Sequence, residues 1–449
     1  MATQHTPESA QVLLLAAADH NLHVLPNLLR QHTPNVADPE TLRTPLHNAI
    51  ASLEKVEPQP PSAEKLKDAE TTIRLLLENG AIWNTLDKEH ETPGCIAYRL
   101  GYEHLYEMMV DAGVRCEMIL NAIGGWEQID SDAEEEGEAE GTVVVENDGE
   151  ADDIPGLVSI DSSIGSIKNS DKMDEDGVIV DAPEADSEKN ATKEKKSHPE
   201  DIAAEISNPD STLSASEVLE YNATTETPSY LSSTLTFTPH SLLDSNRNAV
   251  MMDWESSVMD LTASLLLPEE NTTNRTVLNV GFGMGIVDKA FEKGKPTRHI
   301  IAEAHPDVLK KLREDGWYDM PHVTILEGKW QDTLPIFMLE NPDVTLGAIY
   351  FDTFGESYDQ LKQFFSEYVV GLLDPEVGRF GFFHGLGADR RICYDVYTKV
   401  VEFDLLECGL DTNWVEVDLP ELKTEKWEDV KRKYFNLDTY RLPICTFGA

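Results

Sequence analysis

Apolar positions in the second half of the chain follow two alternating patterns. Short runs rich in β-branched and aromatic residues are separated by longer segments with the apolar spacing of helices. The runs predict strands at 276–282, 299–304, 322–328, 346–353, 378–385 and 414–419, and the segments between them predict helices at 286–294, 306–315, 358–373 and 388–405. Strands and helices that alternate at these lengths favour an α/β fold with a parallel, doubly wound sheet.

The first 123 residues have a helical pattern with signs of a repeat. The segment RTPLHNAI at 43–50 matches the TPLHxA box of ankyrin repeats. A second, degenerate box begins at Thr92, and the excess over the usual repeat length falls in a polar insertion at 52–69. Two or three repeats are near the minimum for a stable solenoid, so we expect this region to pack on something else as well. Generic helical hairpins are the alternative interpretation.

The middle of the chain is strongly acidic. Residues 127–226 contain 30 Asp or Glu and 6 Lys, and almost no aromatic residues. Such a composition cannot bury enough apolar surface to offset the entropy of ordering. The sequence therefore predicts an ankyrin-like α-helical domain at 1–123, a disordered acidic linker at 124–228 and an α/β domain at 229–449.

Charge and cysteine content narrow the function. The chain has 83 acidic and 36 basic residues, a net charge of −47, which argues against direct nucleic-acid binding and suits a cationic partner. The five cysteines are scattered and predict neither a metal site nor a disulfide framework. With no signal peptide and no apolar run long enough to span a membrane, we expect the protein in the cytoplasm and nucleus.

The candidate chemistry lies at the strand ends. A GxGxG turn at 281–285 follows the first strand, and Glu303 ends the second, where a carboxylate can accept the hydroxyls of a ribose. The turn lacks the later glycine of the dinucleotide fingerprint, so S-adenosylmethionine is the leading cofactor. Asp352 ends a later strand and is expected to face the cleft, while Trp330 is either a wall near an adenine or a core residue.

The segments FGMGI, IIAEA, EGKW and YFDT together resemble guanidinoacetate methyltransferase and, more closely, the fungal protein arginine N-methyltransferase 2 family. The resemblance covers roughly 1–123 and 229–449. It implies a class I, Rossmann-like, S-adenosylmethionine-dependent methyltransferase domain coupled to ankyrin-like repeats. The family is described as methylating the δ-nitrogen of arginine in a ribosomal protein, so the implied partner is a basic protein.

The resemblance also implies site residues. Met251 and Glu255 would border the guanidino group, and Tyr230 resembles the lid aromatic, although Tyr221 is also near. The implied cofactor shell comprises Tyr230, Met259, Phe282, Gly283, Met284, Gly285, Ile286, Val287, Glu303, Ala304, His305, Lys329, Trp330 and Asp352.

A protonated guanidinium has no available lone pair, so the site must orient it and take a proton. We assign Asp352 as the main orienting and accepting group, with Glu255 opposite. The sequence has no pair of closely spaced glutamates of the kind that ω-arginine methyltransferases use, which favours a guanidinoacetate-like site and a δ-methylated product.

The alternatives are a small-molecule guanidino methyltransferase, a non-catalytic ankyrin scaffold and, more distantly, a NAD-dependent oxidoreductase. In the favoured interpretation, the ankyrin-like region binds the protein substrate.

Overall fold

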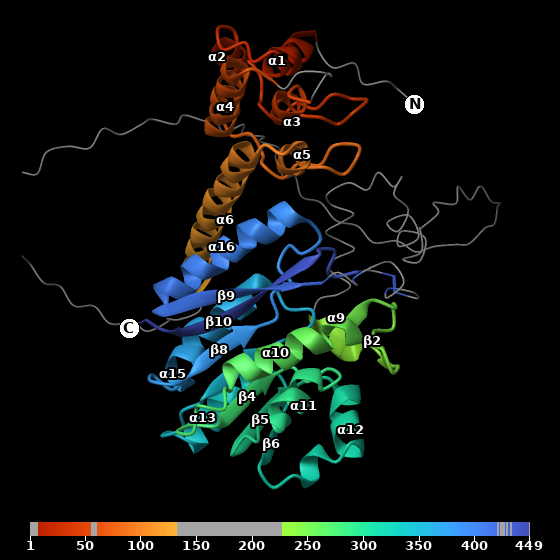
Figure 1. Cartoon of the computed structure of the whole chain (residues 1–449), viewed down its shortest axis with the longest axis vertical. Coiled ribbons are helices and arrows are strands. Elements are labelled where there is room, and N and C mark those ends of the chain that lie inside the picture. Colours follow the sequence, from red (N-terminus) through yellow and green to blue (C-terminus); the bar gives the residue numbers. More distant parts are fainter. Residues whose placement is uncertain are drawn as a thin grey trace, which may run out of the picture. The chain divides into compact units, whose positions relative to one another are not determined.

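The computed structural model describes residues 8–54, 61–132, 227–419, 422, 427, 430–431 and 433–448. Its described parts of 1–126 and 199–449 belong to one compact unit (Figure 1). The predicted linker lies outside the described residues except for 124–132 and 227–228, which are helical and not disordered as predicted. Tyr221 also lies outside the described residues. No helix in the described ranges is long and apolar enough to cross a membrane.

The regular secondary structure of the described N-terminal region consists of helices. They are α1 (Glu8–Ala18), α2 (Leu25–Leu29), α3 (Pro45–Ala51), α4 (Ala63–Glu78), α5 (Pro93–Leu100) and α6 (Glu103–Asp132). The two predicted boxes begin α3 and α5 in the same way. Thr44 and Thr92 are the N-caps, and each is followed by a proline in the first turn, where a missing N–H leaves no bond unmade.

The His of the first box ties its helix to the next loop. His47 is fully buried; its Nδ1 lies 2.9 Å from the Thr44 hydroxyl and its Nε2 lies 3.2 Å from the Glu91 carbonyl. A buried imidazole with a partner at each nitrogen stabilises the contact between α3 and the loop that precedes α5. The assignment of these helices to the ankyrin class stays a prediction.

These helices share a core with α16 (Arg391–Glu407), a helix of the α/β region. Ile392, Val396 and Val400 of α16 are fully buried in the same hydrophobic cluster as residues of α3, α4, α5 and α6. The approach is close at Gly94, where a Cβ would lie 1.8 Å from the end of the Ile392 side chain. The N-terminal region is therefore packed against the α/β region, and α16 contributes to the core of the N-terminal helices.

The α/β region contains a seven-stranded sheet. Its strands are β4 (Thr276–Val280), β5 (Arg298–Glu303), β6 (Val323–Glu327), β7 (Ala348–Phe351), β8 (Arg379–Phe382), β9 (Leu410–Asp418) and β10 (Thr439–Phe447), in the spatial order β6-β5-β4-β7-β8-β10-β9 (Figure 1). From β6 to β8 all neighbours are parallel, as the sequence predicts. The order reverses direction at β4, and that point in an open α/β sheet is where a ligand crevice forms.

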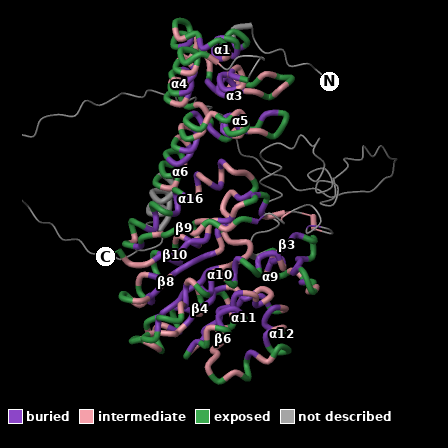
Figure 2. The backbone as a smooth tube through the Cα atoms, viewed as in Figure 1, coloured by how far each residue is buried: buried purple, intermediate pink, exposed green. Residues whose placement is uncertain are grey.

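Helices cover both faces of the sheet. They are α10 (Ser256–Leu266), α11 (Ile286–Lys293), α12 (Pro306–Glu314), α13 (Trp330–Glu340), α14 (Tyr358–Gln363), α15 (Val370–Leu372) and α16, with a π-helix at Phe364–Val369. Alternate residues of β4 enter different clusters: Val277 packs on one face, and Leu278 and Val280 pack on the other. Figure 2 shows β4 and β8 as largely buried, which is why these strands read as continuous apolar runs.

The end of the sheet differs from the prediction of an all-parallel sheet. β10 pairs antiparallel with both β8 and β9, and it was not predicted as a strand. Pro443 lies within β10, and a proline in a run normally argues against a paired strand because it donates no hydrogen bond. β9 also begins at Leu410, four residues before the predicted strand.

A small antiparallel sheet precedes β4 in the chain. It consists of β1 (Thr236–Phe237), β2 (Ser241–Leu243) and β3 (Ala249–Met252), after the short helix α9 (Thr227–Ser232). β3 leads into a single 3-10 turn at Asp253–Glu255 and then into α10. This arrangement brings the segment around 250–255 to the same edge as the ends of the parallel strands.

Truncation of Ile392 to alanine tests the shared core. We expect Ile392→Ala to lower the free energy of unfolding by about 2–5 kcal/mol, because it leaves a cavity where α16 meets the N-terminal helices. The measurement is urea or thermal unfolding of the full chain. Phe403→Ala, on the same helix but 45% exposed, is the control and should change stability by less than about 0.5 kcal/mol. Equal effects of the two variants would contradict the shared core.

Candidate active site

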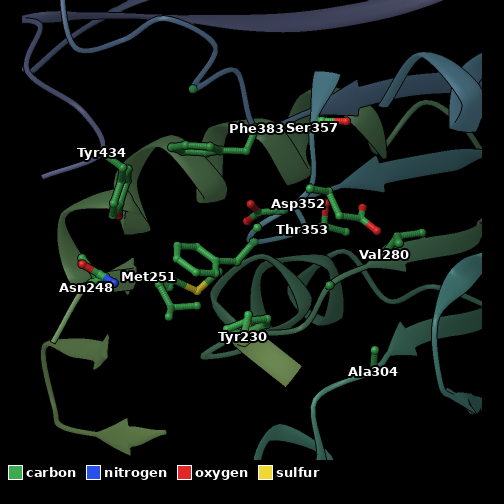
Figure 3. Close-up of a pocket in the computed structure, with 18 of the residues that line it drawn as sticks. Tyr230, Asn248, Met251, Val280, Ala304, Asp352, Thr353, Ser357, Phe383 and Tyr434 are labelled. Atoms are coloured by element: carbon green, nitrogen blue, oxygen red, sulfur yellow. The ribbon is translucent and has the colours of Figure 1, made fainter. Parts of the chain in front are cut away.

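A cavity of about 620 Å³ opens at the carboxyl ends of the parallel strands. Its walls come from the segments that follow β4, β5, β6, β7 and β8, and from α9, β3 and residues 433–434 (Figure 3). Nine predicted site residues line it: Tyr230, Met251, Glu255, Gly283, Glu303, Ala304, Lys329, Trp330 and Asp352. Segments far apart in the chain thus meet where the fold places a ligand.

The glycine turn after β4 has a backbone that other residues rarely adopt. Gly281, Gly283 and Gly285 all have positive φ angles, of 93°, 56° and 66°. A Cβ at Gly281 would lie 2.0 Å from the Asp352 carbonyl oxygen, and one at Gly283 would lie 2.7 Å from the Met251 methyl carbon. The turn therefore needs glycine both for its conformation and for its close contact with β7 and β3.

Glu303 binds the same turn from the end of β5. Its carboxylate accepts hydrogen bonds from the backbone N–H of Phe282 at 2.9 Å and of His305 at 2.6 Å. Burial raises the pKa of this carboxyl, and the backbone donors oppose that shift. The backbone N–H groups of Gly283 and Ala304 also lower this pKa, and the carboxylate lines the cavity, where it can meet the hydroxyls of a ribose.

A buried polar network supports the turn from behind. The Asn279 amide donates to the Gly281 carbonyl at 2.9 Å and to both carboxylate oxygens of Asp288, at 3.0 and 2.9 Å. His299 lies 3.1 Å from Asp288 and 2.8 Å from Glu292. Burial alone would lower the pKa of His299, but these two carboxylates raise it to about 9, so the imidazole is cationic and balances Asp288.

Asp352 presents a carboxylate without a partner. It follows β7, lines the cavity, and its Oδ2 is buried with no hydrogen-bond partner in the described structure. Burial raises the pKa of Asp352, and the negative charge of Asp288 raises it further. A buried acceptor in this state favours binding of a donor or a cation from the cavity.

Glu255 is the second acid of the cavity. It is 2% exposed, and its Oε1 accepts a hydrogen bond from the Met252 N–H at 2.8 Å and another from the Tyr434 hydroxyl. Burial and the charge of Asp352 raise the pKa of Glu255, whereas these two hydrogen bonds lower it. The two acids come from different elements and electrostatically oppose each other's ionisation, so a cation between them would stabilise both carboxylates.

Tyr230, His305 and Phe354 form an aromatic group at the edge of the cavity. The Tyr230 ring lies 4.8 Å from the His305 ring and 4.9 Å from the Phe354 ring, and His305 Nε2 lies 3.2 Å from the Tyr230 carbonyl. His305 is 1% exposed and does not line the cavity, so its position holds the Tyr230 segment in place.

The other predicted residues without a place on the cavity wall lie beneath it. Phe282 packs under the turn, where it fills the space that a Cβ of Gly285 would need, and Met259 and Val287 are buried in the same cluster. Met284 donates its N–H to the Met251 sulfur at 3.2 Å. These contacts give Met259, Phe282, Met284, Gly285, Ile286 and Val287 a structural role, and their contact with a cofactor stays a prediction.

Trp330 is a core residue that also forms part of the cavity wall, and its contact with an adenine stays a prediction. Its ring packs edge-on against Phe351 and Phe364 in the core, and it also lines the cavity. Its indole N–H donates to Glu356 at 3.0 Å, which fixes the ring.

Sequence reasoning missed many of the cavity residues, and Asn248, Phe383 and Tyr434 are three of them. Phe383 follows β8 in the segment GRFGFFHG, so its place at a strand end was a usable signal. Asn248 lies three residues before Met251, so its position in the chain was a usable signal, whereas Tyr434 lies in a loop far from every motif.

The chain has close relatives among fungal proteins. Residues 238–376 match the family described as Guanidinoacetate N-methyltransferase. The chain is 41% identical to Protein arginine N-methyltransferase 2 of Aspergillus fumigatus, over 98% of this chain and 96% of the relative. It is 39% identical to the protein of the same name from Neurospora crassa, over 99% and 97%. Among solved structures, the O-methyltransferase TomG from Streptomyces achromogenes in complex with SAM aligns over 43% of this chain and 80% of its own, with 14% identity and a TM-score of 0.31.

The strand order, the glycine-rich turn and the strand-end acid define a Rossmann-like methyltransferase. The residues present fit S-adenosylmethionine: Gly281, Gly283 and Gly285 expose backbone that no side chain of their own covers, and the Glu303 carboxylate lines the cavity, where it can accept from a ribose. Similarity over nearly the whole length then settles the family. The chain belongs to the fungal protein arginine N-methyltransferase 2 family and is a protein-arginine N-methyltransferase.

Removal of the Glu303 carboxylate tests the cofactor side of the cavity. We expect Glu303→Ala to weaken S-adenosylmethionine binding by about 1–3 kcal/mol, because hydroxyls of the ribose lose their acceptor and the turn loses the bond from the Phe282 N–H. Calorimetry on the full chain measures this. Glu327→Ala is the matched control, because Glu327 is the register partner of Glu303 on β6 but is exposed and outside the cavity lining. Equal affinities of the two variants would contradict the assignment.

Proposed function

We propose that this enzyme uses S-adenosylmethionine to monomethylate the δ-nitrogen of arginine in a basic protein, and that this protein is ribosomal. The supporting observation is the pair of cavity acids, Asp352 and Glu255, with Asp352 Oδ2 buried and unpartnered. A guanidinium is the side-chain cation that offers several donors in one plane to such acceptors.

The acids bind and orient the substrate. A guanidinium between Asp352 and Glu255 supplies the positive charge that would return the pKa of both carboxyls toward ordinary values. Fixing the plane of the guanidinium directs one nitrogen to the cofactor side of the cavity. Such positioning can lower the reaction barrier by several kcal/mol. When bound, S-adenosylmethionine supplies an electrophilic methyl group on its sulfonium.

A carboxylate also takes up the proton that the reaction releases. The guanidinium loses a proton as its nitrogen forms the new bond to carbon, and the product returns to the guanidinium form after methylation. Asp352 is the proposed acceptor, because its Oδ2 has no other donor in the described structure. Transfer onward to water leaves the carboxylate ready for the next substrate.

The matched family supports δ-selectivity. Residues 238–376, which include Glu255 and Asp352, match the Guanidinoacetate N-methyltransferase family, whose name describes N-methylation of a guanidino compound. We propose that the methylated nitrogen is the one that carries the carbon chain. On arginine, the nitrogen bearing the chain is the δ-nitrogen. Two acids from separate elements can hold the two terminal nitrogens and leave the δ-nitrogen facing the methyl donor. This nitrogen has one hydrogen, so a second methylation there is excluded.

Substitution of Asp352 by asparagine tests its role. We expect Asp352→Asn to retain S-adenosylmethionine binding and to lose about 10²–10⁴-fold in turnover, because the amide is nearly isosteric but accepts no proton. Turnover is followed by transfer of a labelled methyl group to ribosomal protein. Asp359→Asn, at an exposed position of α14, is the control and should behave as the unmodified enzyme. Near-normal turnover of Asp352→Asn would remove Asp352 from the mechanism.

The product itself tests the proposed function. Incubation of the full chain with S-adenosylmethionine and ribosomal protein should yield δ-monomethylarginine and no dimethylated arginine. Fragmentation mass spectrometry separates the isomers, because a δ-methyl group stays with the chain-side fragment when the terminal guanidino portion is lost. Loss of the methyl group with the terminal amine would show the opposite orientation, and faster methylation of guanidinoacetate than of protein would show a small-molecule enzyme.

A further inference from the structure

Tyr434 is a cavity residue outside every predicted motif. It lies in the segment before β10, lines the cavity, and donates its hydroxyl to Glu255 Oε1. The Met252 N–H donates to the same oxygen at 2.8 Å, so Glu255 Oε2 takes neither of these bonds. Two donors on one oxygen determine how the carboxylate plane is turned.

Aromatic packing fixes the position of the Tyr434 hydroxyl. The ring of Tyr434 lies 5.2 Å from Trp427, 6.0 Å from Trp254 and 6.1 Å from Phe383, measured between ring centroids. Trp254 immediately precedes Glu255, so the same cluster holds the donor and the acceptor. The hydroxyl therefore does not depend on a bound substrate for its placement.

Tyr434 is a permanent donor in this pair. Burial raises the pKa of its phenol, and the charge of Glu255 raises it further, so the proton stays on the tyrosine. A neutral donor on a carboxylate favours the ionised form of that carboxylate.

The other groups that face Glu255 do not replace this donor. Asp352 opposes its ionisation, and the buried phenols of Tyr350 and Tyr440 remain neutral near it. Lys433 and Asp389 line the same cavity and carry opposite charges. Among the described groups, only Tyr434 and Met252 donate direct hydrogen bonds to the Glu255 carboxylate.

We propose that Tyr434 is a positioning residue for arginine methylation: its hydroxyl binds Oε1 of Glu255 and turns the carboxylate so that Oε2 faces the guanidinium. The proposal rests on the proposed function of Glu255 as one arm of the guanidinium clamp. It assigns Tyr434 no contact with the reacting atoms, and its effect passes through Glu255.

The test is the pH dependence of Tyr434→Phe in the full chain. Loss of the donor raises the pKa of Glu255, so we expect kcat/KM to fall about 10–100-fold at neutral pH and to recover as the pH rises. The acidic limb of the pH profile should move to higher pH, while S-adenosylmethionine affinity and the melting temperature stay close to those of the unmodified enzyme. Fluorotyrosine in place of Tyr434, a stronger donor with the same ring, should move this limb to lower pH.

A direct titration gives a readout that is independent of activity. In protein labelled with carbon-13 at glutamate carboxyls, the Glu255 signal, assigned with Glu255→Gln, should titrate at higher pH in Tyr434→Phe. Tyr106→Phe is the matched control, since Tyr106 also donates its hydroxyl to a carboxylate, that of Asp395, but lies outside the cavity lining. It should leave both the pH profile and the Glu255 titration unchanged.

The outcomes separate the two proposals. Near-normal activity of Glu255→Gln would overturn the proposed function of Glu255 itself. An inactive Glu255→Gln with an unshifted profile in Tyr434→Phe and in the fluorotyrosine variant would overturn only the role of Tyr434. An equal loss of activity at every pH, with an unshifted Glu255 titration, would also overturn it.

Discussion

Burial of a carboxylate away from water raises its free energy unless donors or a cation compensate for the lost solvent. In this protein the compensation is uneven, because Glu255 receives two hydrogen bonds on one oxygen and Asp352 has an oxygen with none. A planar cation in the cavity would compensate for the desolvation of both carboxylates and so lower their free energy. In the proposed function, the chemistry of the cavity depends on these two acids, which both line the cavity and have no cationic partner among the described residues.

The same backbone positions serve the cofactor side and the substrate side. The Asp352 carbonyl packs against Gly281 while its carboxylate reaches the cavity, and Met251 contacts the glycine turn four residues before Glu255. A shift of the turn would therefore move both acids relative to the bound methyl donor. Because displacement of a reacting group by about 1 Å can cost 10²-fold in rate, such shared contacts constrain the reaction geometry. The network of Asn279, Asp288 and His299 holds the turn from its other side.

The sequence predicted the parts of the structure that have local signals. Buried parallel strands read as continuous apolar runs, and the glycines of 281–285 mark a turn, so Glu303 and Asp352 could be placed at strand ends. β10 was not predicted, because Pro443 is atypical of a paired strand. The antiparallel pairing of β10 also depends on contacts distant in sequence. Tyr434 was not predicted for a related reason. It lies 179 residues from Glu255 in the sequence, and only the tertiary structure brings its phenol to that carboxylate.

The position of α16 bears on what the N-terminal helices do. α16 follows the cavity-lining loop 383–389, and its buried residues complete the core of the N-terminal helices. Asp395 of α16 accepts from Tyr106 of α6 and pairs with Arg441 of β10 at 2.6 Å, which ties the helices to the sheet. Removal of residues 1–123 would expose Ile392, Val396 and Val400, so loss of activity after deletion would report exposed core as well as lost substrate binding. A role of these helices in protein recognition is separable from their structural role only through substitutions at exposed positions, where the core with α16 stays intact.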